Sequence, residues 1–248
     1  MTGFRRLFPT GKPVFGMLHL GGESPEDRVE TALREASIMD DAGFDAVIVE
    51  NYFGDVRDVE AVLEAMSGAT LRCRVGINVL GDTERAFVLA ARYRADFIQV
   101  DSVCGHLHPE EDAAYGRRLS ELRVISDAVL LGGVRFKYMP VRSGRSEAED
   151  LRIGRERCDA IVVTSDATGK PTDIGKVRRF RDVLGPETPL LIGAGLTPEN
   201  VAERFSVADG GIVGSWLKDN HQDNGRISPK HVEIFLEGAR GSGPEPGL

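Results

Sequence analysis

The sequence predicts an α/β fold, a single-domain (β/α)₈ TIM barrel. Short β-branched segments alternate with amphipathic segments along the chain, and strict alternation of this kind is typical of a parallel sheet. Eight such units in 248 residues give about 31 residues per unit, close to the roughly 30 residues of a βαβ repeat. Eight units with no ninth favour closure of the sheet into a barrel.

The expected elements follow from apolar runs and from residues that suit helix starts. Strands are expected at residues 14–19, 46–50, 75–79, 97–101, 134–138, 160–164, 190–194 and 211–214. Helices are expected at residues 25–41, 59–69, 83–94, 113–128, 146–157, 174–184, 198–205 and 231–237. Pro25 and Pro198 suit a first helical turn, where a missing N–H leaves no hydrogen bond unmade. The barrel domain is expected over residues 1–240, and the Gly- and Pro-rich residues 241–248 are expected to form a flexible tail.

A doubly wound open sheet is the alternative arrangement of the same units. That fold often carries a Gly-x-Gly-x-x-Gly turn after its first strand, and no such turn follows residues 14–19. The barrel is therefore preferred, and its strands are mostly apolar, as strands covered on both faces should be.

Composition restricts the class of partner. Hydrophobic residues make up 41% of the chain, enough for a sizeable core, and the net charge is −8. An acidic surface repels nucleic-acid phosphates and anionic lipids, so neither nucleic acid nor a membrane is an expected partner. No apolar run approaches the roughly 20 residues that cross a bilayer, and no signal peptide is recognisable at the amino terminus. The three cysteines are scattered, which fits a reducing environment, so a cytoplasmic protein is expected.

Functional groups gather at the carboxyl ends of the expected strands, where barrels of this kind place their chemistry. A structural rim has little reason to carry a polar or charged group at nearly every strand end, because a buried charge is costly unless it is paired. The polar and small residues at these positions are His19, Glu50, Asn51, Asn78, Asp101, Lys137, Thr164, Asp166, Gly193, Gly195, Gly214 and Ser215. We therefore expect a small-molecule site at this end of the barrel.

The loops after the last two strands are expected to bind phosphate. Gly193 and Gly195 end the seventh unit's strand, and Gly214 and Ser215 follow the eighth. Small residues let backbone N–H groups approach a ligand, and many barrels hold a phosphate at this place. The alternative is that these glycines only permit tight turns. The expected substrate-binding set is His19, Asn51, Asn78, Thr164, Gly193, Gly195, Gly214 and Ser215.

The expected catalytic residues are Glu50, Asp101, Lys137 and Asp166. Glu50 and Asp101 suit proton transfer or stabilisation of a developing positive charge, and equally suit a divalent cation. No fixed-spacing metal motif decides between these roles, so a metal stays open, and no organic cofactor is expected. Lys137 is expected to pair with Asp101 or Asp166 or to bind an anionic ligand. A Schiff base on Lys137 is the alternative and requires a desolvated amine.

Several segments of the chain resemble the BtpA-like family of TIM-barrel proteins, named for a role in photosystem I biogenesis. The resemblance covers roughly residues 14–236 and implies the same barrel. The matching segments are residues 16–20, 43–51, 76–80, 95–100, 159–164, 191–201 and 208–214, with Lys218. Two positions at the expected site depart from the family pattern, which usually has Asn in place of Asp101 and His in place of Tyr138. These departures allow a substrate or reaction different from that of other members.

The leading hypothesis is an enzyme that acts on a phosphorylated sugar and transfers the phosphosugar group to a nitrogenous base, similar to barrel-type phosphoribosyltransferases. Breaking a sugar–pyrophosphate bond develops positive charge on the sugar, which Glu50 or Asp101 would stabilise. Mg²⁺ is expected if the donor is a pyrophosphate. The alternatives are a phosphosugar isomerase, epimerase or aldolase, and a non-catalytic assembly factor of the BtpA type. The sequence leaves the oligomeric state open and is compatible with a homo-oligomer.

Overall fold

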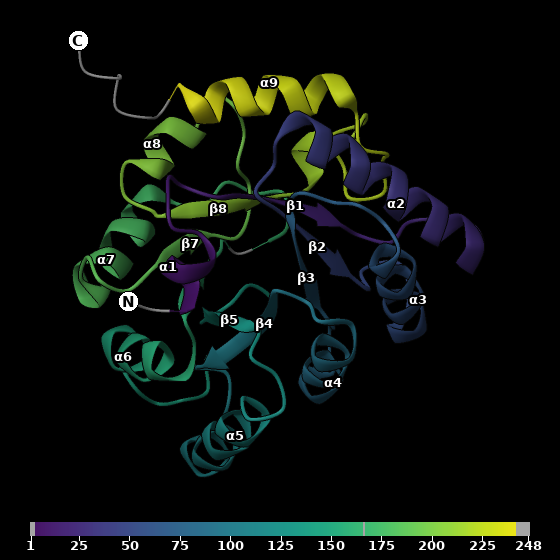
Figure 1. Cartoon of the computed structure of the whole chain (residues 1–248). Coiled ribbons are helices and arrows are strands. Elements are labelled where there is room, and N and C mark those ends of the chain that lie inside the picture. Colours follow the sequence, from purple (N-terminus) through teal and green to yellow (C-terminus); the bar gives the residue numbers. More distant parts are fainter. Residues whose placement is uncertain (1–2, 166, 242–248) are drawn as a thin grey trace.

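The computed structural model describes residues 3–165 and 167–241 and confirms a closed barrel of eight parallel strands (Figure 1). Each strand pairs with the next one along the chain, and β8 pairs back to β1. The strands are β1 (Val14–Leu18), β2 (Ala46–Glu50), β3 (Arg74–Asn78), β4 (Phe97–Cys104), β5 (Val129–Val134), β6 (Ala160–Val163), β7 (Leu190–Ile192) and β8 (Gly210–Val213).

Helices surround the barrel and cover its outer face (Figure 1). They are α1 (Gly3–Leu7), α2 (Pro25–Ala42), α3 (Val56–Ser67), α4 (Thr83–Tyr93), α5 (Pro109–Leu122), α6 (Glu147–Arg157), α7 (Ile174–Leu184), α8 (Val201–Phe205) and α9 (Pro229–Arg240), with a 3₁₀ helix η1 (Ser215–Leu217). The expected tail lies outside the described residues from 242 onward, and so does Asp166.

Local sequence explains where several helices begin. Asp55 caps α3 and forms a capping box with Asp58, so this helix starts at Val56, three residues before the expected start. Ser146 and Glu149 form the equivalent box at the start of α6. Pro25 occupies the first turn of α2, as expected. The helix expected at residues 198–205 is shorter than expected, because residues 198–200 form a turn before α8.

Apolar side chains fill the inside of the barrel and leave one end for a site. Phe15, Phe97 and Leu131 belong to this inner core. The helix α1, which the sequence analysis does not anticipate, adds Phe4 to it, with ring centroids of Phe4 and Phe15 6.5 Å apart. In Figure 1 this helix lies over the opening of the strand ring, and it contacts β5. The amino-terminal end of the barrel is therefore covered.

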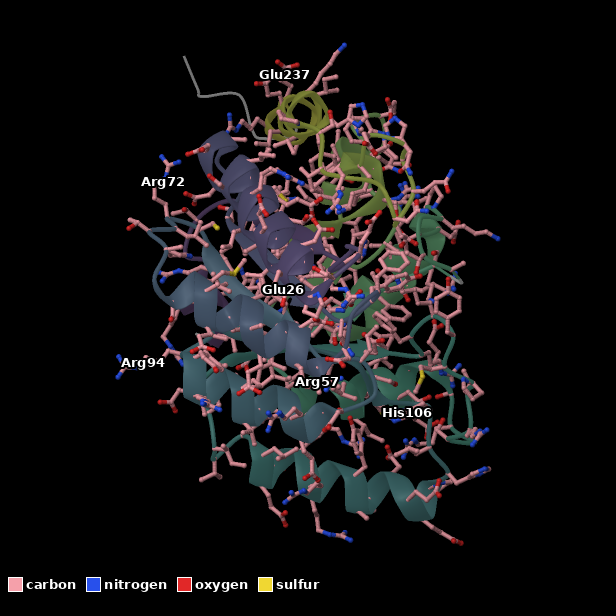
Figure 2. The ribbon with its side chains drawn as sticks, turned by 90° about the vertical axis from the view of Figure 1, so that its right-hand side faces the viewer. Glu26, Arg57, Arg72, Arg94, His106 and Glu237 are labelled. Carbon is pink, nitrogen blue, oxygen red and sulfur yellow. The ribbon has the colours of Figure 1, made fainter. Side chains whose placement is uncertain are left out.

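The other end carries the loops that follow the strands. In Figure 2 Arg72 and Arg94, from the loops before β3 and β4, lie at the left end of the molecule. His106, which follows β4, lies toward the right. The carboxyl ends of the strands thus face the right of Figure 2, and the candidate site is built there.

The fifth unit is where the sequence prediction is wrong. The strand expected at residues 134–138 is β5 at Val129–Val134, and the preceding helix ends at Leu122 rather than at residue 128. Gly132 and Gly133 interrupt the apolar run in β5 and hide its strand character. The fold requires them, because a Cβ on Gly133 would lie 2.0 Å from the Asp101 carbonyl oxygen. Lys137 consequently lies in the loop after β5, not at a strand end.

The fourth strand is also longer than expected. β4 continues to Cys104, and its pairing with β5 shifts register between Val100 and Cys104. Asp101 therefore lies inside a strand, at the irregularity, rather than at a strand end. A break in register of this kind re-aims side chains next to functional sites.

Candidate active site

A cavity of about 300 Å³ opens at the carboxyl end of the barrel. Eight of the expected site residues line it: His19, Glu50, Asp101, Lys137, Gly193, Gly195, Gly214 and Ser215. Three others, Asn51, Asn78 and Thr164, lie outside its lining and hold neighbouring groups in place. Asp166 lies outside the described residues. Two groups of residues lie at the cavity, one on β2 to β4 and one in the loops after β7 and β8.

The first region, called here the carboxyl wall, consists of Glu50, Asn78 and Asp101. Asn78 Nδ2 donates to Glu50 Oε2 at 2.6 Å and to Asp101 Oδ1 at 3.0 Å. One buried amide at the end of β3 therefore bridges two carboxyls from the strands on either side of it. Burial, and then the charge of Asp101, raises the pKa of Glu50 to about 8. Burial also raises the pKa of Asp101, opposed by the hydrogen bond from Asn78.

The environments of these two carboxyls suit an acid–base pair. Two adjacent carboxyl groups do not both ionise readily in a buried place. At neutral pH Glu50 is mostly protonated and is a proton donor, while Asp101 is the better candidate for the anion. Pairs of titratable groups whose environments separate their pKa values are typical of acid–base sites.

Lys137 faces this pair without touching it. Its Nζ donates to Thr168 Oγ1 at 2.9 Å, and the described residues show no direct ion pair with Asp101. Asp166, the other expected partner, lies outside the described residues. The positive charge nevertheless lowers the pKa of both Glu50 and Asp101. Thr164 fixes the backbone here, because its Oγ1 accepts a hydrogen bond from the Lys137 N–H at 3.0 Å. Lys137 is thus a cation held at the cavity wall, placed to meet an anionic part of a ligand.

His19 is a neutral ring in this site. Burial, and then the charge of Lys218, lowers its pKa to about 4. Its Nδ1 lies 3.3 Å from the Asp223 carbonyl oxygen, which only accepts, so the proton is on Nδ1. The Nε2 atom then carries a lone pair and lies near Gly214, 3.4 Å from where a Cβ on that residue would be. His19 is therefore suited to accept a hydrogen bond or a proton rather than to bind an anion.

The second region, called here the glycine loops, consists of residues 193–197 and 214–216. The described residues provide no hydrogen-bond acceptor for the backbone N–H groups of Ala194, Gly195, Leu196, Gly214 and Ser215. All five residues line the cavity. Backbone N–H groups gathered in this way are typical of phosphate and other anion sites.

Side chains around the glycine loops hold their shape. Gly195 has φ +69°, and a Cβ there would lie 2.1 Å from the Lys170 carbonyl oxygen, so glycine is required. Asn200 accepts from the Thr197 N–H at 3.0 Å and donates to the Gly195 carbonyl at 2.9 Å. Ser215 Oγ donates to Asp223 Oδ1, so its hydroxyl hydrogen is already used. Ser215 would therefore contact a ligand through its N–H.

Asn51 has a structural role in place of the expected contact with substrate. Its Oδ1 accepts from the Leu80 N–H at 2.7 Å, and its Nδ2 donates to the Leu80 carbonyl at 3.5 Å. This side chain closes the loop after β3 against the end of β2. The sequence shows only that Asn51 follows a strand, and that position alone does not separate a ligand contact from a loop clasp.

Several lining residues were not anticipated, including Tyr52, Gln99, Thr168 and Trp216. Gln99 carried a usable signal, because it precedes Asp101 by two residues and side chains alternate along a strand. Tyr52 and Thr168 lie in loops and Trp216 in the three-residue helix η1, where no periodicity predicts which side chains turn inward.

Neither a metal cluster nor a membrane span is found in the parts of the chain that the structure describes. Residues 3–165 and 167–241 contain no group of three or more His, Cys, Asp or Glu side chains placed to hold a metal ion. Over the same ranges, every helix is too short or too polar to cross a bilayer.

Comparison with known proteins relates this chain to one protein family and to barrel enzymes of the same fold. The model of the BtpA family matches residues 10–241. The chain is 31% identical to an uncharacterized protein of Thermococcus kodakarensis, over 92% of this chain and 95% of that relative. It is 30% identical to the photosystem I biogenesis protein BtpA of Synechocystis, over 94% of this chain and 89% of that relative. The solved structure of N-(5′-phosphoribosyl)anthranilate isomerase from Pyrococcus furiosus shares the fold, with a TM-score of 0.60, 18% identity, and coverage of 93% and 99%.

Proposed function

The chain belongs to the BtpA family, and we propose that it is an enzyme that transfers a phosphosugar group to a nitrogenous base. The observation that carries this proposal is the carboxyl wall facing a cavity whose other side is the glycine loops. One side offers two carboxyls whose pKa values are raised, that of Glu50 to about 8, and the other offers backbone N–H groups without acceptors among the described residues. A sugar phosphate has the two kinds of group that such a cavity would bind.

The phosphate of the substrate would lie against the glycine loops. The N–H groups of Gly195, Leu196 and Ser215 would donate to its oxygens, and Lys137, which also lines the cavity, would supply positive charge. The Pyrococcus furiosus isomerase, which shares the fold, is named for a phosphoribosyl compound. That name supports a sugar phosphate as the class of ligand.

The sugar carbon that reacts would lie against Asp101. Loss of pyrophosphate from this carbon develops positive charge on the sugar, and a buried carboxylate stabilises such charge strongly. With Glu50 protonated, Asp101 would ionise without a second negative charge near it, since the two carboxyls interact electrostatically. After the base nitrogen attacks, a carboxylate of this wall accepts its proton.

Mg²⁺ belongs to the proposal only through the substrate. This ion is commonly held by one or two carboxylates together with substrate phosphates. Asp101 provides one such carboxylate, while Glu50 is mostly protonated at neutral pH. The donor set therefore fits a cation brought in by a pyrophosphate better than a resident metal centre, and Asp101 is the residue that would hold it.

Turnover of defined substrates tests the proposal. The purified protein is incubated with phosphosugar pyrophosphates and a panel of nucleobases, with and without Mg²⁺, and products are identified by mass spectrometry. Formation of a base–phosphosugar product that requires both reactants is expected. Consumption of neither reactant would contradict the proposed transfer.

An isomerase or epimerase is the second candidate, and the same acid–base pair favours it. A protonated Glu50 beside an ionised Asp101 could move a proton between adjacent carbons of a phosphosugar without any second substrate. Change of the phosphosugar with no base consumed would identify this activity.

An assembly role is the remaining alternative, suggested by the name of the Synechocystis relative. It predicts no turnover and a protein partner that binds independently of phosphosugar. A scaffold gains nothing from a glutamate whose burial raises its pKa to about 8, because such burial destabilises the folded chain. This argument favours the enzymatic proposal.

A further inference from the structure

Gln99 is a buried polar residue that neither the acid–base pair nor the glycine loops use. It lies on β4 two residues before Asp101, so both side chains face the inside of the barrel. Its side chain lines the cavity although the residue is only 4% exposed. The other strand residues in the lining are carboxyls, Glu50 and Asp101, or apolar, Met17 and Ile212. Gln99 thus adds a neutral polar group to this wall.

The neighbouring carboxyl determines how the Gln99 amide is oriented. Gln99 Nε2 lies 3.5 Å from Asp101 Oδ1. A carboxylate offers only acceptors, so the NH₂ end of the amide faces Asp101 and the carbonyl end faces elsewhere. That carbonyl oxygen, Oε1, is buried and has no hydrogen-bond partner among the described residues.

An unpartnered buried acceptor is unfavourable to the folded protein by itself. Because the Gln99 side chain lines the cavity, a ligand bound there that reaches Oε1 would supply the missing hydrogen bond. The missing partner is a donor, which excludes a phosphate oxygen, an ether oxygen and a carboxylate. Sugar hydroxyl groups are donors of the required kind.

We propose that Gln99 Oε1 accepts a hydrogen bond from the sugar hydroxyl on the carbon next to the reacting one. The inference rests on the proposed function, in which Asp101 acts at the anomeric carbon. Because the Gln99 amide touches Asp101, a sugar whose anomeric carbon lies against Asp101 brings its 2-hydroxyl toward Gln99. Gln99 is then a specificity-determining residue that favours sugar phosphates over 2-deoxy sugar phosphates.

The physical basis is the cost of an unpaired polar group. A site built to hydrogen-bond a hydroxyl rejects the analogue that lacks it, because the acceptor in the wall is left buried and unpaired. A variant without this acceptor should lose the preference for the hydroxylated sugar. Its wall offers the hydroxyl no partner, and binding of the deoxy sugar does not depend on the acceptor.

The test compares two variants with the wild type. Gln99→Met keeps the length of the side chain and removes the acceptor, whereas Gln99→Glu keeps an acceptor oxygen at the same reach. Calorimetry measures the affinities of ribose 5-phosphate and 2-deoxyribose 5-phosphate, and of glucose 6-phosphate and 2-deoxyglucose 6-phosphate. Thermal melting of each variant verifies that it is folded.

The wild type is expected to prefer the hydroxylated member of the pair that it binds by about 10-fold or more. Gln99→Met should weaken binding of that member about 10-fold and change the affinity for the deoxy member by no more than about twofold. Gln99→Glu should keep the preference.

Failure of this inference and failure of the proposed function give different results. Equal affinities for both members of a pair in the wild type, or an unchanged preference in Gln99→Met, would overturn the role of Gln99 and leave the proposed function standing. No binding of any of the four compounds to the wild type would overturn both. If Gln99→Met does not fold, loss of the preference in folded Gln99→Glu would overturn the inference, and retention would support it.

Discussion

The two sides of the cavity use different chemical groups, side-chain carboxyls on one side and backbone N–H groups on the other. The carboxyl wall on β2 to β4 uses buried ionisable side chains on strands, held together by one amide, Asn78. The glycine loops after β7 and β8 use backbone N–H groups in loops, with glycine where a Cβ would meet Lys170. The carboxyl wall places ionisable groups where their charged forms are poorly solvated. The glycine loops present backbone N–H groups, which do not depend on the side chain.

This difference suggests that the carboxyl wall acts in the reaction and that the glycine loops act in binding. A side chain whose burial shifts its pKa is unfavourable to folding and is explained by a task in a reaction. Backbone N–H groups hold an anion equally in the ground state and in the transition state, so they contribute mainly to affinity. Substitutions in the carboxyl wall should therefore change the rate, and substitutions in the glycine loops should change affinity.

Asp101→Asn is the strongest test of that separation. The variant keeps the size of the side chain and an oxygen that accepts from Asn78, but it loses the negative charge. If Asp101 stabilises positive charge in the transition state, kcat should fall by on the order of 10²-fold or more. Affinity for a phosphosugar without a pyrophosphate group should change little, because the phosphate site is on the opposite side of the cavity.

Rate, affinity and melting temperature measured on one Asp101→Asn preparation distinguish the possible outcomes. A purely structural Asp101 would alter the melting temperature and leave kcat intact. Full activity in this variant would remove Asp101 from the mechanism and leave Glu50 as the main candidate.

Gly214→Val tests the other side of the comparison. A Cβ at Gly214 would lie 3.1 Å from His19 Cε1, so a larger side chain enters the space beside the backbone N–H groups. Calorimetry should show phosphosugar binding weakened by on the order of 10-fold, about the loss of one charge-assisted hydrogen bond. The rate at saturating substrate should change much less.

A matched control for this variant is Gly68→Val. Gly68 follows α3, and a Cβ there has 3.7 Å to its nearest neighbour, the Ala65 carbonyl oxygen. This control should bind phosphosugar like the wild type. Unchanged affinity in a folded Gly214→Val protein would show that the anion does not lie at the glycine loops.

The same contrast explains how much the sequence could predict. The eightfold alternation predicts the barrel and its strand order. The expected strand ends and the residues that follow them predict eight residues that line the cavity. The strand β5 is missed because Gly132 and Gly133 interrupt its apolar run. The Val103 side chain lies against Gly132, and the Asp101 carbonyl oxygen lies against Gly133. Lys137 was therefore assigned to the wrong element, although it does reach the cavity.

Contacts made by single side chains were beyond prediction. Asn51 and Asn78 both follow or end neighbouring strands, yet one closes a loop and the other bridges two carboxyls. Only the relative position of elements distant in sequence separates these roles. The expected role of Asp166 lies outside the described residues and stays a prediction.

The smallest expected effect is a pH dependence of stability. It measures how much the raised pKa of Glu50 in the carboxyl wall destabilises the folded protein. The pKa of Glu50 is about 8 in the folded chain against an ordinary 4.5. Between these values the unfolded chain has released the proton and the folded chain has not, so stability falls as pH rises. His19 acts oppositely, with a pKa of about 4 against an ordinary 6.5. Its neutral folded form makes stability rise with pH between those two values.

The two effects oppose each other from pH 4.5 to 6.5, and above pH 6.5 only that of Glu50 continues. The melting temperature of the wild type should therefore fall by a few degrees between pH 6.5 and 8, as about 1–2 kcal/mol of linkage gives for a domain of this size. Glu50→Gln keeps an oxygen that accepts from Asn78 and cannot titrate, so its melting temperature should stay level over this range. His19→Asn is the control, because it should change the profile below pH 6.5 and leave the fall above it. An equal fall in Glu50→Gln would mean that Glu50 is ionised in the folded protein, and the carboxyl wall would then not be the acid–base pair on which the proposed chemistry depends.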